Sequence, residues 1–265
     1  MAASRFLDAM RDRPLLLDGG MGVRLIVAGF LDESEDSSRA NLDAAEAVLA
    51  IHRDDVRAGS DALVTNTISA DRRSLASDWR TDEFDAINRA AVSLAREAAG
   101  PDRFVLGSIG PIRFGSPTEY REHATILIES GVDALLLETH TSITAEAGLR
   151  ALSSGSPVPI LASLHAWPID AAGAAKRLVD LGAVAVGTNC GRSTDHVLAC
   201  LEQLAGRIDV PLLAKPSAGP DEGPEVFAAL VPQFLAMGVR LIGGCCGATA
   251  QHVAAMRRAL DLASA

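Results

Sequence analysis

The feature that most constrains this chain is a regular alternation between two kinds of segment. Short apolar runs are followed by longer stretches rich in Ala, Leu, Arg and Glu. The short runs are apolar throughout rather than alternating in polarity, which is typical of strands buried on both faces of a parallel sheet. The chain contains eight such runs: Leu15–Gly19, Ala62–Asn66, Phe104–Ile109, Ala134–Glu138, Pro159–Leu164, Ala183–Asn189, Pro211–Lys215 and Leu241–Gly244.

Each short run is followed by a segment with the length and apolar periodicity of a helix. In Leu42–Ala58 the apolar side chains recur along one side, and Gly59 follows as a stop signal. The other expected helices are Asp82–Ala99, Thr118–Glu129, Thr144–Leu152, Ala171–Leu181, Thr194–Leu204, Glu225–Met237 and Thr249–Leu260.

Eight strand–helix units in about 250 residues predict a (β/α)8 TIM barrel, an α/β fold. We expect residues 1–265 to form this barrel as a single domain. An open, doubly wound sheet is the alternative. It is disfavoured because no G-x-G-x-x-G motif follows the first expected strand.

Composition excludes several kinds of partner. The chain has 24 Lys and Arg against 34 Asp and Glu, which gives a net charge of −10, and it has no cluster of basic residues. We therefore expect no nucleic-acid binding. No apolar stretch approaches the ~20 residues of a membrane helix, and the N-terminus lacks the apolar run of a signal peptide. We therefore expect a cytoplasmic protein without membrane contact. Four cysteines in such a chain favour metal binding or catalysis over disulfides.

Three of the four cysteines fall at the ends of expected strands. Cys190 ends the sixth strand, and Cys245 and Cys246 end the eighth. In a barrel these ends share one mouth, and the flanking glycines permit the break that lets adjacent thiols converge. Three thiolates suit Zn²⁺ and leave its fourth position open, as in catalytic zinc sites. The alternative is three unrelated buried thiols that pack as small apolar groups, which is our expectation for Cys200 within a helix.

The polar residues at other strand ends favour an amino acid that carries a thiol. A thiol coordinated by the metal is deprotonated at neutral pH. Asp18 and Glu138 end buried runs, where a charge is costly without a partner or a function, and together they can hold an ammonium group. Asn66 and the backbone N–H groups of Gly19–Gly22 can hold a carboxylate. The alternative is that each acid caps a helix or pairs with an arginine.

Other residues at the mouth allow a different class of enzyme. Lys215 ends the seventh expected strand and is a candidate Schiff-base lysine of an aldolase, although no neighbour in the sequence explains a lowered pKa. His140 and His165 are either acid–base groups or polar residues without a chemical role.

Several of these segments resemble the homocysteine S-methyltransferase family, which includes the homocysteine-binding module of cobalamin-dependent methionine synthase. The resemblance runs from about Leu15 to Leu260, and its specific part is Gly-Gly-Cys-Cys-Gly with a distant Asn-Cys. The segments that carry it are Leu17–Gly22, Thr65–Thr67, Gly107–Pro111, Leu137–Thr139, Asn189–Cys190 and Gly243–Gly247.

The resemblance implies a zinc-bearing barrel that transfers a methyl group from a donor to the thiolate of homocysteine, giving methionine. By resemblance, the zinc ligands that activate the thiol are Cys190, Cys245 and Cys246. By the same resemblance, Asp18 and Glu138 contact the amino group of homocysteine. The implied surroundings of its carboxylate are Gly19, Gly20, Thr65 and Asn66.

The methyl donor is the least determined part of this hypothesis. One Tyr and two Trp disfavour an aromatic cage for betaine. This leaves S-methylmethionine, S-adenosylmethionine or a methyl group delivered by a corrinoid or folate protein. Val23, Ile68 and Ser217 depart from the family's usual residues near the mouth. A second hypothesis is a non-catalytic subunit that binds homocysteine and zinc within a larger methyl-transfer complex.

Overall fold

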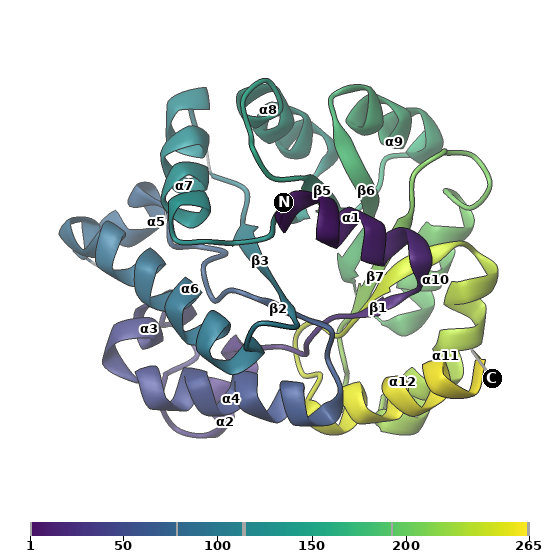
Figure 1. Ribbon diagram of the computed structural model, residues 1–265, viewed down its shortest axis with the longest axis horizontal. Helices are drawn as coiled ribbons and strands as arrows, with labels where there is room; N and C mark the ends of the chain where they lie inside the picture. The colour runs from purple at the N-terminus through teal and green to yellow at the C-terminus, as the bar shows by residue number, and fades with distance from the viewer. Residues whose placement is uncertain (1, 78, 113–114, 192, 264–265) are drawn as a thin grey trace.

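The computed structural model describes residues 2–77, 79–112, 115–191 and 193–263. Eight parallel strands form one sheet in the order β1-β8-β7-β6-β5-β4-β3-β2, and helices surround it (Figure 1). The strands are β1 (Leu15–Leu16), β2 (Ala62–Val64), β3 (Phe104–Ile109), β4 (Ala134–His140), β5 (Ile160–Leu164), β6 (Ala183–Cys190), β7 (Leu212–Pro216) and β8 (Val239–Ile242). The protein is a (β/α)8 barrel, which confirms the fold predicted from the sequence.

All eight expected strands are present, with shifted ends. β1 stops at Leu16 rather than at Gly19, and β8 spans Val239–Ile242 rather than Leu241–Gly244. Both strands end early because the glycines that follow them form the turns at the barrel mouth. The other expected strands differ from the observed ones by at most two residues at either end.

The helices agree with the expected set and add three that the sequence did not indicate. The expected helix Leu42–Ala58 is interrupted at Ala44, whose φ of −142° and ψ of 43° are not helical. The helices are α1 (Ala2–Asp12), α2 (Gly22–Val27), α3 (Ala40–Asp43), α4 (Ala45–Ala58), α5 (Arg72–Ser77), α6 (Phe84–Ala99), α7 (Pro117–Glu129), α8 (Ser142–Leu152), α9 (Ala171–Asp180), α10 (Thr194–Glu202), α11 (Pro224–Ala236) and α12 (Ala250–Ala263). Short 3-10 helices span Ser37–Arg39 and Thr81–Glu83. The unexpected helices are α1, α2 and α5.

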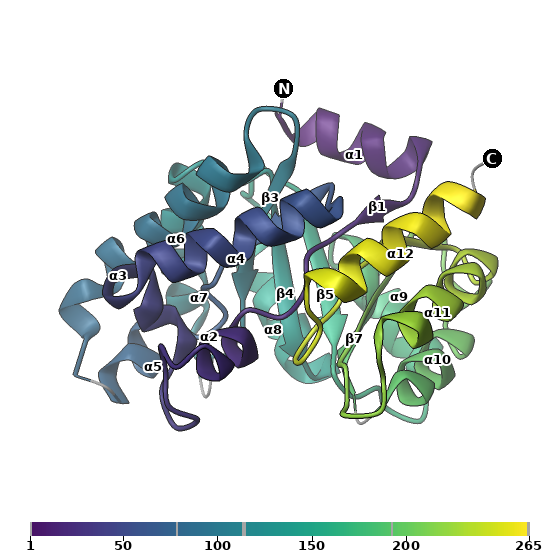
Figure 2. The ribbon, with the colours of Figure 1, turned by 90° about the horizontal axis from the view of Figure 1, so that it is seen from below.

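Helix α1 closes one end of the barrel. It lies across the barrel in Figure 1 and outside the ring of helices in Figure 2. Phe6 and Met10 of α1 are buried in the cluster inside the barrel, and the Phe6 ring meets the Phe104 ring edge-on at 5.3 Å between centroids. Because this cluster fills the end at which the strands begin, a ligand can enter only from the end at which they finish.

Two side-chain carboxylates and a main-chain hydrogen bond close the barrel between β1 and β2. No ladder joins these two strands in the part of the chain that the structure describes. Instead, the Leu16 N–H donates to the Asp61 carboxylate at 2.8 Å, and the Asp61 N–H donates to the Leu16 carbonyl at 2.6 Å. Asp18 accepts a bond from the Val64 N–H at 2.8 Å, and Arg257 holds Asp61 from outside. Two carboxylates thus replace the missing ladder bonds, and one of them, Asp18, stands at the mouth.

None of the described helices combines the length and the apolarity needed to cross a membrane. The expected cytoplasmic location and the expected lack of nucleic-acid partners stay predictions.

Two histidines are buried in the helical layer, and they make stability depend on pH. Burial, with a contribution from Arg24, lowers the pKa of His52 to about 3, and burial lowers that of His123 to about 3. Because unfolded histidine titrates near pH 6.5, their contribution to stability is complete above that pH and is lost as the pH falls toward 3. When the pH falls from 7 to 5, we expect each of these two histidines to lower the free energy of unfolding by about 2 kcal/mol.

Urea denaturation at the two pH values measures this difference. His52→Leu should reduce the pH dependence, whereas His165→Gln, at an exposed position, should leave it unchanged. Equal stability of the parent protein at pH 7 and pH 5 would contradict the prediction.

Candidate active site

A cavity of about 480 Å³ opens at the carboxyl ends of the strands. It is the natural place for a site, because the other end of the barrel is filled by the core. All nine candidate site residues from the sequence line it: Asp18, Gly19, Gly20, Thr65, Asn66, Glu138, Cys190, Cys245 and Cys246. The fold therefore brings together residues that are more than 200 positions apart in the chain.

The three cysteines form one cluster at the base of this cavity. Their Sγ atoms all lie within 4.8 Å of one another, and those of Cys190 and Cys245 are 2.9 Å apart. Cys190 is the last residue of β6, while Cys245 and Cys246 belong to the turn after β8. Gly247 closes that turn with a φ of +76°, so the strand breaks where the sequence requires it to break.

The chemistry of the cluster fits a divalent metal ion. The hydrogen bond with Cys190, burial and the nearby charge of Glu138 raise the pKa of Cys245 to about 12 when no cation is present. Thiols crowded in this way ionise together only if a cation offsets their charge, and three sulfurs are the donor set of a soft ion. Cys200 lies apart, buried within α10, as expected.

Two residues beside the cluster have left-handed backbones, which is rare for residues other than glycine. Cys190 has a φ of +58° and Thr139 a φ of +64°, and such conformations cost ~1–3 kcal/mol each. Asn189 holds Thr139 in place: its Oδ1 accepts from the Thr139 N–H at 3.0 Å, and its Nδ2 donates to the Thr139 hydroxyl at 2.7 Å. Asn189 was not among the predicted site residues. Its signal in the sequence was an amide one position before a candidate ligand, at a strand end.

Glu138 and Lys215 form a buried ion pair. The Lys215 Nζ lies 2.7 Å from Glu138 Oε1, with 4% and 8% of the two side chains exposed, and the Ser108 hydroxyl donates to Glu138 Oε2 at 2.8 Å. Burial alone would lower the pKa of Lys215, but the carboxylates of Glu138 and Asp18 outweigh it and raise that pKa. Lys215 is therefore a persistent ammonium group, which is the opposite of what a Schiff-base aldolase needs. This pairing was not foreseen from the sequence.

Asp18 presents the least satisfied polar atom in the cavity. Its side chain is buried, and Oδ2 accepts the bond from Val64, while Oδ1 has no hydrogen-bond partner among the described residues. Burial raises the pKa of Asp18 to about 7, although the charge of Lys215 opposes this shift. A buried carboxylate oxygen without a partner is a site for a cation or an N–H donor of a ligand.

Gly19 and Gly20 allow close contact between the β1 turn and the cysteine turn. A Cβ on Gly20 would lie 2.4 Å from the Cys245 carbonyl oxygen, and one on Gly19 would lie 2.6 Å from the Ala248 carbonyl oxygen. Their N–H groups are bonded within the protein, Gly20 to Ala248 at 2.9 Å and Gly19 to Asp55. Their expected contact with a substrate carboxylate stays a prediction, and in this structure the Gly20 N–H holds the two turns together.

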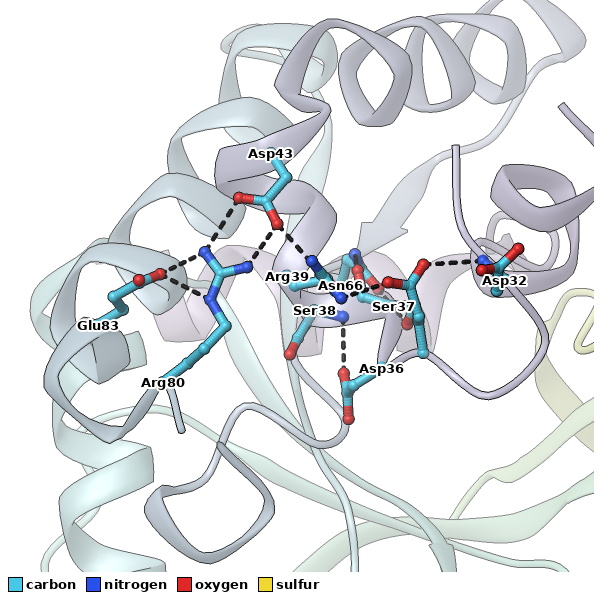
Figure 3. Close-up of polar contacts among 10 residues, drawn as sticks. Asp32, Asp36, Ser37, Ser38, Arg39, Asp43, Asn66, Arg80 and Glu83 are labelled. Carbon is cyan, nitrogen blue, oxygen red and sulfur yellow. Dashed lines mark hydrogen bonds and ion pairs between the residues drawn. The ribbon is translucent and has the colours of Figure 1, made fainter. Parts of the chain in front are cut away.

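Asn66 fastens the connection after β1 to the end of β2, as Figure 3 shows. Its Nδ2 donates to the Ser37 carbonyl at 2.6 Å, its Oδ1 accepts from the Ser37 hydroxyl at 2.9 Å, and its own carbonyl accepts from Asn41 at 2.8 Å. The same connection is held by the ion pair of Arg39 with Asp43 (Figure 3). The amide of Asn66 thus shapes the cavity wall, and its contact with a substrate carboxylate stays a prediction.

Thr65 and the two histidines also make bonds within the protein. Thr65 Oγ1 lies 2.7 Å from Thr67 Oγ1 and accepts from the Ser108 N–H at 3.0 Å. His140 is buried, its Nε2 lies 3.1 Å from the Ile109 carbonyl oxygen, and burial lowers its pKa to about 4. His165 is exposed, with Nδ1 3.0 Å from the Thr139 carbonyl oxygen. Both histidines therefore brace the rim instead of lining the cavity.

Fold and site together define a (β/α)8 barrel with a three-cysteine candidate metal site at its mouth. The chain belongs to the homocysteine S-methyltransferase family, which it matches over residues 15–260.

Known proteins with similar sequences and structures agree with this membership. The methionine synthase of Mycobacterium tuberculosis is 28% identical over 295 residues, an alignment that covers 93% of this chain and 24% of that protein. The chain thus spans about a quarter of the length of that relative. The homocysteine methyltransferase MmuM from Escherichia coli, in its oxidized form, is 25% identical with a TM-score of 0.83, covering 95% of this chain and 98% of MmuM. Its metallated form gives 24% identity and a TM-score of 0.82, covering 97% and 99%.

The cysteine cluster predicts a metal stoichiometry that depends on each thiol. We expect the reduced protein, loaded with a divalent metal and dialysed against a weak chelator, to retain one ion per chain. Cys246→Ser should retain much less, because it replaces a soft thiolate with a hydroxyl. Elemental analysis measures the metal, and Cys200→Ala is the control that should retain it. Full retention by the Cys246→Ser variant would show that the ion binds elsewhere.

The buried ion pair predicts a large effect on stability. Lys215→Met leaves the Glu138 carboxylate buried without its counter-charge and should lower the free energy of unfolding by about 3–5 kcal/mol. The double variant Glu138→Gln, Lys215→Met removes both charges, keeps an acceptor for Ser108 and should recover most of the loss. Urea denaturation at pH 7 measures both. A loss below about 1 kcal/mol for the single variant would contradict the buried pairing.

Proposed function

We propose that this barrel transfers a methyl group from a donor to the thiolate of homocysteine, forming methionine, with Zn²⁺ held by Cys190, Cys245 and Cys246. The observation that carries the proposal is the cluster of three thiols in one cavity with an unpartnered buried carboxylate. Family membership and the likeness to metallated MmuM, a homocysteine methyltransferase, support it.

The carboxylates of the cavity account for recognition of the amino acid. Asp18 Oδ1, which lacks a hydrogen-bond partner among the described residues, accepts a hydrogen bond from the substrate ammonium group. Glu138 supplies a second negative charge, and its Oε1 lies 2.7 Å from Lys215 Nζ. The predicted carboxylate contacts, Thr65 and Asn66, line the same cavity.

The cysteines account for activation of the thiol. Zn²⁺, when bound, keeps a coordinated substrate thiol deprotonated at neutral pH. Cys190, Cys245 and Cys246 contribute three ligands and leave space in the cavity beside them. The cavity then holds the thiolate and the methyl carbon in line, and this positioning lowers the entropic barrier of the transfer.

The outer wall of the cavity receives the donor. The apolar residues Val23, Ile26, Leu31 and Ile68 are among the lining residues of the cavity. S-methylmethionine, S-adenosylmethionine or a methyl group carried by a corrinoid or folate protein are the donors that we propose. A role in methionine biosynthesis in the cytoplasm is part of this proposal.

A second candidate function is that of a non-catalytic subunit that binds homocysteine and zinc in a larger methyl-transfer complex. The likeness to one part of methionine synthase, which covers 24% of that relative, favours it. The two functions differ in one property: the subunit binds homocysteine but does not turn over small donors.

A donor panel with homocysteine and the zinc-loaded protein tests the proposal, with methionine measured by mass spectrometry. We expect methionine from at least one donor. Asp18→Asn should raise the KM for homocysteine about 10- to 100-fold, because it weakens a charged hydrogen bond while keeping an acceptor for Val64. Glu33→Gln, an exposed acid outside the cavity lining, is the matched control. Homocysteine binding without turnover of any donor would favour the second function, and no binding at all would exclude both.

A further inference from the structure

We propose that Asn189 is a positioning residue whose side-chain amide shares one N–H between the sulfurs of Cys190 and Cys245, and so lowers the electron density that these sulfurs offer to a bound metal. The inference rests on the metal site of the proposed function, but it does not depend on the methyl donor. It also assigns a role to a residue that the sequence analysis left without one.

The orientation of the Asn189 amide is fixed by its partners. Its oxygen lies 3.0 Å from the Thr139 main-chain nitrogen, and an N–H of the main chain can only donate. The Ser163 hydroxyl lies 2.7 Å from the same oxygen. The NH₂ group must therefore be on the other side of the amide, which is the side of the sulfurs.

The distances place this NH₂ group in contact with two of the three thiols. Asn189 Nδ2 lies 3.6 Å from Cys190 Sγ and 3.8 Å from Cys245 Sγ, which are hydrogen-bond distances for sulfur. Asn189 is fully buried, so water does not compete for its N–H bonds. A hydrogen bond to a thiolate is charge-assisted and gains strength in such a dry site.

The local charges explain why an N–H donor is needed at this position. The nearby cation, Lys215, is bonded to Glu138 at 2.7 Å. Glu138 also adds its negative charge to the surroundings of the cysteines. A neutral amide can withdraw electron density from two sulfurs without adding a charge of its own. Outer donors of this kind tune both the affinity of a metal site and the electron density that its ligands supply.

The same amide couples the sulfurs to the unusual backbone at the mouth. Through its oxygen and its second N–H bond it holds Thr139, which has a φ of +64°, and it directly precedes Cys190, with a φ of +58°. The amide therefore sets both the position of Cys190 and the charge on its sulfur. A test must separate these two effects.

Binding of Co²⁺ separates them, because the energy of the thiolate-to-Co²⁺ charge-transfer band reports the electron density on sulfur. Asn189→Asp has nearly the same shape and keeps the acceptor for Thr139 and Ser163, but it replaces the NH₂ donor with a carboxylate oxygen. We expect it to bind Co²⁺ about 10- to 100-fold more weakly in chelator competition. We also expect its charge-transfer band at lower energy, because the sulfurs lose their hydrogen bonds.

Two further variants complete the experiment. Asn189→Ser removes the amide without adding a charge and should shift the band in the same direction, which guards against misfolding of the Asp variant. Ser163→Ala removes a bond on the oxygen side of the same amide, and it should lower stability while leaving the band and the affinity unchanged. A purely structural role would instead make Ser163→Ala and the Asn189 variants alike.

The outcomes distinguish this inference from the proposed function. Unchanged affinity and band energy in both Asn189 variants would overturn the inference, even if the parent protein forms methionine. Failure of the parent protein to bind Co²⁺ would overturn the inference and the metal site together. The expected shifts in a protein that forms no methionine with any donor would support the inference and count against the proposed function.

Discussion

The structure depends above all on the balance of charge inside the barrel mouth. Two buried carboxylates, Asp18 and Glu138, line one cavity with three cysteines. Lys215, bonded to Glu138 at 2.7 Å, offsets part of this negative charge. Asp18 Oδ1 still has no hydrogen-bond partner among the described residues. In the proposed function, two further cations enter this cavity: a metal ion at the sulfurs and the ammonium group of an amino acid at Asp18.

The barrel links this chemistry directly to its own closure. β1 and β2 are joined by side-chain bonds, and one of them runs from the Val64 N–H to Asp18. The second oxygen of the same carboxylate has no hydrogen-bond partner among the described residues, and Asp18 lines the cavity. Gly19 and Gly20, which follow Asp18, allow the turn after β1 to lie close to the backbone of the cysteine turn. Residues that complete the sheet between β1 and β2 thus also set the position of the candidate metal ligands. A substitution there changes both the fold and the site.

Much of the fold was accessible from local pattern. The eight apolar runs predicted the eight strands because a strand that is buried on both faces is apolar at nearly every position. Helix α1 was missed from the sequence. The surface against which it packs, the open end of the barrel, forms only when the chain folds. Helices α2 and α5 are six residues each, too short for a periodic signal. The break at Ala44 carries neither Gly nor Pro, and the sequence offers no sign of it.

The sequence by itself determined the barrel and the place of the thiols at its mouth, because these follow from the apolar runs and from the residue type at the end of each strand. Only the tertiary structure decided what each polar group faces. It paired Lys215 with Glu138, bonded Asn66 to Ser37 and turned the Asn189 amide toward two sulfurs. The physical reason is that a hydrogen bond forms only when two groups from strands far apart in the chain are placed to within a few tenths of an ångström. The apolar periodicity that predicts strands and helices, in contrast, is present in the local sequence.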